Sequence, residues 1–157
     1  MTTGMKTDEL LTIGYEGTTS AEVLALLREA GVRLLIDIRA VAASRKPGFS
    51  KTRLAAGLQE QGIAYLHLQG LGTPKEGRQA VRSGQPRKME AIYAEHLRSD
   101  RAQAELAHAI ELARTERSCL LCFERDHNTC HRRLVAEAIV AITGQPVWHL
   151  AVPQAVI

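Results

Sequence analysis

Short apolar runs alternate with helix-like stretches along most of the chain, and this order limits the possible folds more than any other feature. The clearest run is residues 34–38, Leu-Leu-Ile-Asp-Ile, which is typical of a strand buried on both faces. Comparable runs occur at residues 10–13, 63–68, 118–123 and 147–150. Strands that alternate with helices imply right-handed crossovers and a mainly parallel sheet. We therefore predict an α/β fold with a mainly parallel sheet of about five strands and helices on both faces.

Signals for helix starts lie between these runs. A capping box begins at Thr19, in front of an apolar helix face. Ser50 and Thr129 are candidate N-caps for two further helices, of which the second would be the last helix of the chain. Residues 88–114 are predicted to be helical, with a break near Ser99. Each predicted helix lies between two predicted strands, as the crossover pattern requires.

The chain of 157 residues fits a single domain, which we take to span residues 1–157. Residues 1–9 are predicted to be a flexible tail. Residues 70–88 are rich in Gly, Pro and basic side chains and are predicted to form a long basic loop. The basic side chains of this loop, set against the single acid Glu76, are Lys75, Arg78, Arg82, Arg87 and Lys88. Contact with nucleic-acid phosphates would explain them, but a solvated loop is the commoner arrangement and we favour it.

Composition narrows the class of protein. No apolar run approaches the roughly 20 residues of a membrane helix, and the first residues lack the apolar stretch of a secretory signal. The three cysteines are an odd number and all fall between residues 119 and 130, which argues against a disulfide framework. We therefore expect no membrane partner and a cytoplasmic location. The net charge of +3 permits an acidic partner without requiring one, and nothing predicts an oligomeric state.

Three polar segments follow predicted strands, at residues 14–17, 37–44 and 124–132. The carboxyl ends of parallel strands meet at one edge of a sheet, where such folds bind ligands. We therefore expect these segments to converge on one polar site. Gly14 opens a glycine turn before a helix, which suits contact with phosphate or carboxylate, although the turn lacks the lysine of a P-loop.

The segment Cys130-His131-Arg132 is the strongest local signal for chemistry. With Thr129 as N-cap, these residues would occupy the first turn of a helix, where unpaired backbone N–H groups attract anions. Arg132 would strengthen that attraction. The same environment favours the thiolate form of a cysteine, so Cys130 is a candidate nucleophile. The alternative, a small buried apolar residue at a helix start, also stays open.

Two carboxylates are candidate general bases. Asp37 ends a buried strand two residues before Arg39, so both side chains would lie on the same face of that strand. Asp37 would either take a proton from a substrate or simply hold Arg39 and the loop amides in place. Glu124 shares a predicted strand face with Cys122 and allows the same two interpretations.

Two cysteine patterns raise the question of a metal. Cys119 and Cys122 have metal-site or redox spacing, but side chains three apart on a strand point to opposite faces. A second set of side chains that zinc can bind comprises Cys122, Glu124, Cys130 and His131. Their spacing matches no standard zinc pattern. We therefore predict no metal and no cofactor, and a Cys/His/Glu metal-binding protein stays an alternative.

Four separated blocks of residues resemble one known family. They are Thr12-Ile13-Gly14-Tyr15-Glu16-Gly17; Asp37-Ile38-Arg39 with Ser44 and Phe49; the turns Gly62-Ile63-x-Tyr65 and Leu71-Gly72; and Leu121-Cys122-Phe123-Glu124 followed by Cys130-His131-Arg132. Over nearly its full length the chain resembles the family catalogued as domain of unknown function 488. The resemblance implies an α/β fold with these polar residues gathered at one site, and it implies no particular reaction. Ala42 departs from the family, which usually has proline between the Asp-x-Arg and Ser positions.

The favoured hypothesis is an enzyme that acts on a small anionic or phosphate-bearing substrate. Its predicted catalytic residues are Cys130, Glu124 and Asp37. Its predicted substrate-binding residues are Gly14, Tyr15, Arg39, Ser44, His131 and Arg132. The alternatives are a nucleic-acid-associated binding module and the metal-binding protein described above.

Overall fold

A five-stranded parallel sheet forms the centre of the molecule. The computed structural model describes residues 8–153, and its strands are β1 (Leu10–Gly14), β2 (Leu34–Asp37), β3 (Ala64–His67), β4 (Ser118–Cys122) and β5 (Val147–His149). Their order in the sheet is β3-β2-β4-β1-β5, and every neighbouring pair is parallel. The predicted α/β class with a mainly parallel sheet is confirmed.

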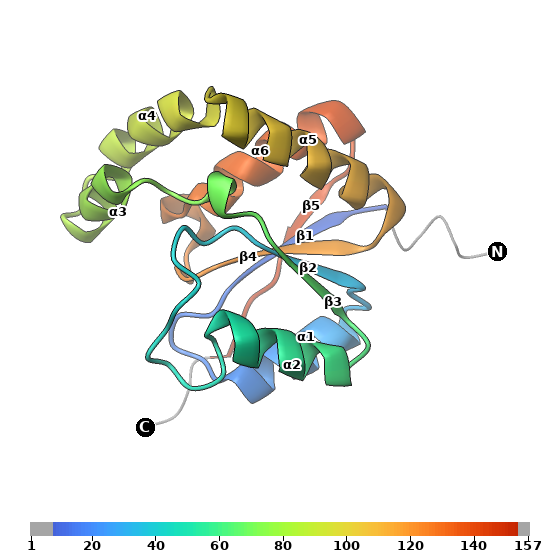
Figure 1. Ribbon diagram of the computed structural model, residues 1–157. Helices are drawn as coiled ribbons and strands as arrows, with labels where there is room; N and C mark the ends of the chain where they lie inside the picture. Colours follow the sequence, from blue (N-terminus) through green and yellow to red (C-terminus); the bar gives the residue numbers. More distant parts are fainter. Residues whose placement is uncertain (1–7, 154–157) are drawn as a thin grey trace.

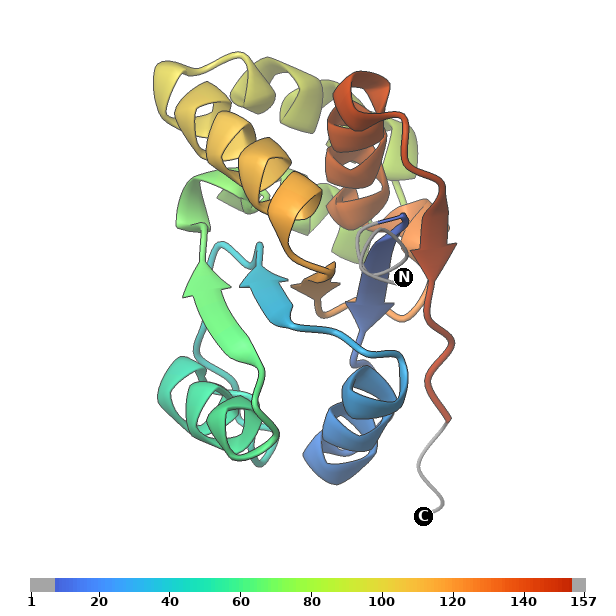
Figure 2. The same ribbon diagram turned by 90° about the vertical axis from the view of Figure 1, so that its right-hand side faces the viewer.

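Helices cover both faces of the sheet. α1 (Ser20–Glu29) and α2 (Lys51–Glu60) pack on one face (Figure 1). α5 (Asp100–Thr115) and α6 (His131–Thr143) pack on the other. Figure 2 shows the strands between these two helix layers, as the alternation of strands and helices predicted.

The central strands are buried on both faces because their apolar side chains alternate between two cores. In β1, Leu10 belongs to the core under α5 and α6, whereas Leu11 and Ile13 belong to the core over α1 and α2. In β4, Cys119 belongs to the core over α1 and α2, whereas Cys122 contacts Arg132 of α6. The two cysteines therefore lie on opposite faces of the sheet, which is the reason for rejecting them as a paired motif.

Residues 70–88 do not form the long loop that the sequence predicted. Most of them belong to α3 (Lys75–Arg82) and to the start of α4 (Pro86–Leu97). A proline stands immediately before α3 and at the start of α4, where its missing N–H group is not needed. α3 buries only two small residues, Gly77 and Ala80, and most of its other residues are charged or polar. The composition therefore looked like that of a loop although the backbone is helical.

The N-cap predicted for α1 is confirmed, and the one predicted for α6 is wrong. Thr19 accepts a hydrogen bond from the first turn of α1 (3.2 Å), and Ser99 does the same for α5, which confirms the predicted break. Thr129 was the predicted cap of α6, but it ends the 3₁₀ turn η3 (His127–Thr129). Cys130 is the cap instead, and its sulfur accepts a hydrogen bond from the backbone N–H of Arg132 (3.4 Å).

The predicted tail of residues 1–9 falls mostly outside the described residues. Glu9, which is described, forms an ion pair with Arg117 (2.9 Å). Within residues 8–153, no helix combines the length and the apolar character required to cross a membrane.

Candidate functional site

A cleft lies at the carboxyl edge of the sheet, where the sequence predicted a polar site. Its volume is about 400 Å³, and α3 forms a wall beyond the strand ends (left in Figure 1). Each predicted polar segment contributes to the lining: Tyr15 from the first, Arg39 and Ser44 from the second, Glu124 and His131 from the third. Residues distant in sequence thus meet at one cleft, because parallel strands end at the same edge.

Asp37 and Arg39 form a buried ion pair behind the cleft. Arg39 donates from Nε and Nη2 to the two carboxylate oxygens (2.9 and 2.7 Å), and the hydroxyl of Tyr65 donates to the same carboxylate (2.6 Å). Burial alone lowers the pKa of Arg39, but the hydrogen bond and charge of Asp37 raise it above its ordinary value. Asp37 is fully buried and is not part of the cleft lining. Its position fits the structural interpretation rather than that of a general base.

The remaining terminal nitrogen of Arg39 is also held by the protein. Nη1 donates to the backbone oxygen of Phe49 (2.7 Å) and to the hydroxyl of Tyr15 (3.0 Å). The ring of Tyr15 stacks on that of Phe49, with centroids 4.1 Å apart. Arg39 is therefore fixed in the cleft wall, and most of its N–H groups already have acceptors.

Ser44 lies in the same wall, in a loop braced by Ser50. The hydroxyl of Ser50 accepts from the backbone N–H of Ser44 and donates to its backbone oxygen, both at 3.0 Å. The sequence predicted that Ser50 caps α2. Ser50 does precede α2, but its hydroxyl is used by Ser44 and makes no capping hydrogen bond to the helix. The loop is thus held by internal hydrogen bonds.

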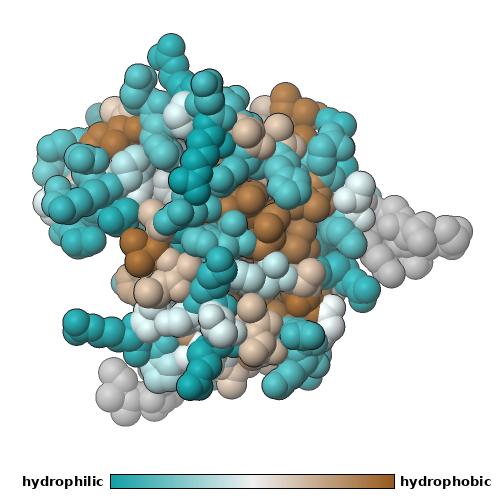
Figure 3. Space-filling view, viewed as in Figure 1, coloured by the Kyte–Doolittle hydropathy of each residue, from teal (hydrophilic) through white to brown (hydrophobic). Residues whose placement is uncertain are grey.

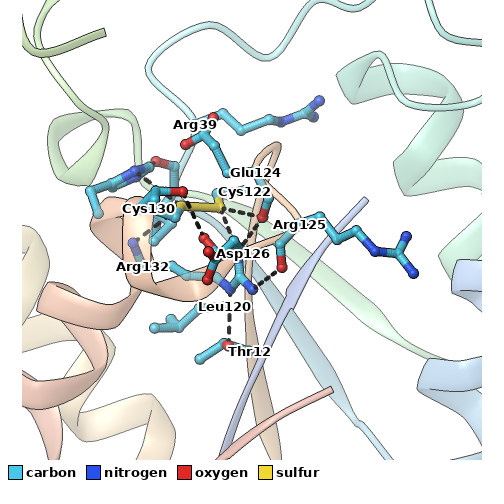
Figure 4. Close-up of a disulfide and its surroundings, with 12 residues drawn as sticks. Thr12, Arg39, Leu120, Cys122, Glu124, Arg125, Asp126, Cys130 and Arg132 are labelled. Atoms are coloured by element: carbon cyan, nitrogen blue, oxygen red, sulfur yellow. Dashed lines mark hydrogen bonds between the residues drawn. A yellow bond between two sulfur atoms is a disulfide. The ribbon is translucent and has the colours of Figure 1, made fainter. Parts of the chain in front are cut away.

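Arg132 is used inside the protein rather than in the cleft (Figure 4). Its side chain is only 1% exposed. Nε donates to the hydroxyl of Thr12 (3.0 Å), Nη2 to the backbone oxygen of Arg125 (3.2 Å), and Nη1 to the backbone oxygen of Glu124 and the sulfur of Cys122. The prediction that Arg132 clamps an anion does not fit this position. Its donors hold the loop between β4 and α6 (residues 123–130, the β4–α6 loop) against β1.

Gly14 makes this arrangement sterically possible. A Cβ atom at Gly14 would overlap the backbone oxygen of Glu124 and the guanidinium of Arg132. Its predicted role was contact with an anionic ligand, but its neighbours are parts of the protein. The missing side chain therefore allows close approach of the β4–α6 loop to the end of β1.

A disulfide joins Cys122, which lines the cleft, to Cys130 (Figure 4). The sequence argued against a disulfide framework, and this single bond was not predicted. Cys122 ends β4 and Cys130 begins α6, and the turn between them returns the chain to the same place. Cys130 is 1% exposed, so in this state it is neither a free nor an accessible thiol. Cys119, buried on the other face, is the free cysteine.

His131 lies next to the disulfide and is neutral at pH 7. Its Nε2 donates to the backbone oxygen of Ile38 (2.8 Å), which leaves Nδ1 as an acceptor 3.7 Å from the sulfur of Cys130. Burial lowers the pKa of His131 to about 4. A neutral imidazole therefore forms part of the cleft lining.

Glu124 is the predicted carboxylate that does line the cleft. Burial raises its pKa above its ordinary value, and the charge of Glu16 acts in the same direction, against the opposing charge of Arg132. A carboxylate oxygen of Glu124 and the sulfurs of Cys122 and Cys130 all lie within 4.8 Å of one another. An acidic group thus stands beside the cysteine pair.

Comparison with known proteins identifies the family of the chain. The family model described as a domain of unknown function, DUF488, matches residues 19–139. The chain belongs to the DUF488 family. Comparison with curated proteins and with solved structures gave no significant match. The matched range contains the Asp37–Arg39 pair and the β4–α6 loop, whereas the glycine turn at residues 14–17 precedes it.

Two arginines of the DUF488 cleft were not among the predicted site residues. Arg78 and Arg82 line the cleft from α3, and their spacing of four residues places them on one face of that helix. Figure 3 shows hydrophilic side chains gathered over this end of the molecule. From the sequence, both arginines were assigned to a solvated loop. Recognising the helix would have identified them as a pair.

Proposed function

We propose that this DUF488 protein is an enzyme whose cleft binds a small phosphate-bearing substrate. The observation that carries the proposal is the position of Arg78 and Arg82, one helical turn apart on α3 and both in the cleft wall. Their two positive charges face a cleft in which Arg39 is already neutralised by Asp37. The charge that attracts the ligand therefore comes from α3.

The guanidinium groups of α3 have donors to spare. Among the described residues, Arg78 gives one hydrogen bond, from Nη1 to the backbone oxygen of Thr73 (2.8 Å). Arg82 forms no hydrogen bond or ion pair within residues 8–153 and is exposed. Guanidinium groups with free N–H pairs bind phosphate oxygens in a bidentate manner. This favours phosphate over an uncharged ligand.

The rest of the lining suggests the shape of the ligand. A volume of about 400 Å³ suits a small molecule rather than a folded partner. Phe123 and Val41 also line the cleft, and they remain 45% and 55% exposed. Exposed apolar side chains in the same cleft as a pair of arginines fit a phosphate ester with an apolar or aromatic part. The cleft would bind the phosphate at α3 and the apolar part at Phe123.

The test is calorimetric titration of the full chain with phenyl phosphate and with adenosine monophosphate. We expect the double variant R78A/R82A to raise Kd at least roughly tenfold, because hydrogen bonds to charged groups contribute about 1.5–3 kcal/mol each. The matched control is R87A/K88A, which removes two exposed charges of the same basic segment outside the cleft. It should leave Kd within about twofold.

Three outcomes would contradict the proposal. The first is that neither phosphate ester binds to the wild type. The second is that R78A/R82A binds as tightly as the wild type, and the third is that R87A/K88A loses as much affinity as R78A/R82A. The nucleic-acid alternative predicts a different pattern. A single-stranded oligonucleotide would bind with an affinity that falls steeply with salt, and both double variants would weaken it.

A further inference from the structure

The end of β4 and the loop that leads to α6 bring three potential metal ligands together beside the cleft. They are the sulfurs of Cys122 and Cys130 and a carboxylate oxygen of Glu124, all within 4.8 Å of one another. We propose that reduction of the disulfide converts this cluster into a zinc site with three protein ligands. The inference does not depend on the proposed phosphate ligand, because it rests on a different set of side chains.

The geometry suits zinc. With Zn–S bonds of about 2.3 Å and Zn–O bonds of about 2.0 Å, ligand atoms of a tetrahedral site lie roughly 3.5 Å apart, so the cluster needs only small side-chain rotations to close on an ion. The Cα atoms of Cys122 and Cys130 are 7.5 Å apart, beyond the roughly 4.4–6.8 Å usual for disulfides. This backbone spacing leaves room for an ion between the two sulfurs. Two soft thiolates with one carboxylate favour zinc over calcium or magnesium.

The surroundings of the cluster compensate its charge. Two thiolates and a carboxylate carry three negative charges, which Zn²⁺ and the buried guanidinium of Arg132 would neutralise. Arg132 already donates from Nη1 to the sulfur of Cys122 (3.2 Å), and its backbone N–H donates to the sulfur of Cys130 (3.4 Å). Donors of this kind orient ligands and stabilise thiolates around a metal. In the zinc-bound state, Arg132 would therefore stabilise the two thiolates in addition to holding the loop.

Three protein ligands leave a fourth position of a tetrahedral ion unfilled. Cys122 and Glu124 line the same cleft as Arg78 and Arg82, so the open position would be reached from that cleft. Zinc with an open position polarises a bound oxygen or activates water, in contrast to a structural site with four protein ligands. His131 was one of four zinc ligands considered from the sequence, but the described cluster contains three, without it.

Formation of the zinc site requires a reductant, and a dithiol can supply the two electrons that break the disulfide. The S–S bond breaks, each sulfur gains one electron and one proton, and the dithiol is oxidised to its own disulfide. Zn²⁺ then displaces the two thiol protons, which pass to solvent. Oxidised protein should bind no zinc at this cluster, because disulfide sulfurs are not thiolate ligands.

The experiment compares reduced and oxidised full-length protein. Protein reduced with a dithiol, which is then removed by gel filtration under argon, is titrated with Co²⁺ and separately with Zn²⁺. We expect one ion per chain, with sulfur-to-cobalt charge-transfer absorption and the intense visible bands of tetrahedral Co²⁺. C122S and C130S should lose the charge-transfer absorption, and E124Q should bind Zn²⁺ at least roughly tenfold more weakly. The matched control C119A removes the third cysteine, which lies on the other face of the sheet, and should bind as the wild type does.

Several results would overturn the inference. One is that reduced wild-type protein with Co²⁺ shows no charge-transfer absorption, and another is that oxidised protein binds Co²⁺ as well as reduced protein does. Both measurements use the wild type, so they remain decisive even if a cysteine variant fails to fold. Stoichiometric Zn²⁺ in folded C122S and C130S, judged by circular dichroism, would do the same. Azide should alter the visible spectrum of the cobalt form, and an unchanged spectrum would overturn the open fourth position.

Discussion

The arginines around the cleft fall into two groups that differ in what their donors do. Arg39 and Arg132 are 5% and 1% exposed, and their N–H groups are occupied by a carboxylate, hydroxyls, backbone oxygens and a cysteine sulfur. Arg78 and Arg82 stand on α3, where within residues 8–153 they have one hydrogen bond between them. All four lie at the same edge of the sheet.

The difference follows from the cost of burying charge. A guanidinium buried beside strand ends must be paired and hydrogen-bonded, so it becomes part of the framework. A guanidinium on a solvated helix keeps its donors for a ligand. The arginines of the sequence motifs therefore build the cleft, and those of an inconspicuous helix are the better candidates for contacting what enters it.

The largest effect expected from this comparison is on stability, at Arg132. Arg132→Met should lower the free energy of unfolding by about 4 kcal/mol, because buried acceptors in the β4–α6 loop and on Thr12 lose their donor. Urea denaturation followed by circular dichroism measures the change.

The neighbouring residue is the control. Arg133 pairs with Glu90 and Glu137 on the surface, so Arg133→Met should cost less than about 1 kcal/mol. Similar losses in the two variants would mean that burial does not separate them, and the distinction between framework and free arginines would fail.

The framework could be predicted because its signals are local. A strand buried on both faces needs an unbroken apolar run, and residues 34–38 supplied one that became β2. Parallel topology then placed the polar segments at one edge without any knowledge of side-chain positions. α3 was not predicted because its buried face consists of the small residues Gly77 and Ala80, and a segment rich in glycine, proline and basic residues is typical of a loop.

Individual roles in the site were harder to predict because they depend on tertiary partners. Nothing near Asp37 in the sequence indicates that Tyr65 donates to it from another strand. The Cys122–Cys130 bond depends on a turn that brings the start of α6 back to the end of β4. The sequence gives the types of these groups, and only folding decides which of them face the cleft.

A smaller effect on the free energy of unfolding is expected when the pH changes, and it comes from a histidine close to the buried Arg132. The hydroxyl of Thr12 accepts from Arg132, so its own proton is left for Nδ1 of His149, 2.5 Å away. Burial lowers the pKa of His149 from 6.5 to about 4, and the charge of His127, stacked on its ring, adds to the shift. The unfolded chain therefore takes up a proton near pH 6.5 that the folded protein accepts only near pH 4. The contribution of His149 to stability is present above that window and is lost as the pH falls through it.

His149→Asn tests this linkage, since Oδ1 of asparagine takes the position of Nδ1 and can still accept from Thr12, but asparagine does not titrate. Urea denaturation at about pH 8 and about pH 5 should show a smaller loss of stability on acidification in the variant than in the wild type. His131, whose pKa is also lowered, is present in both proteins and cancels in the comparison. Equal losses would show that His149 is not the group that couples this region to pH.

The smallest effect on stability is expected at α3, and it completes the comparison. R78A/R82A should change the free energy of unfolding by less than about 1 kcal/mol, because Arg82 is exposed and Arg78 gives up a single hydrogen bond. With phenyl phosphate at roughly a hundred times its Kd, the wild type should gain about 2.7 kcal/mol of stability that the variant lacks. Urea denaturation with and without the ligand measures both quantities on the same protein. A loss of several kcal/mol without ligand would place the α3 arginines in the framework beside Arg39 and Arg132, because groups kept for a ligand contribute to stability only when that ligand is bound.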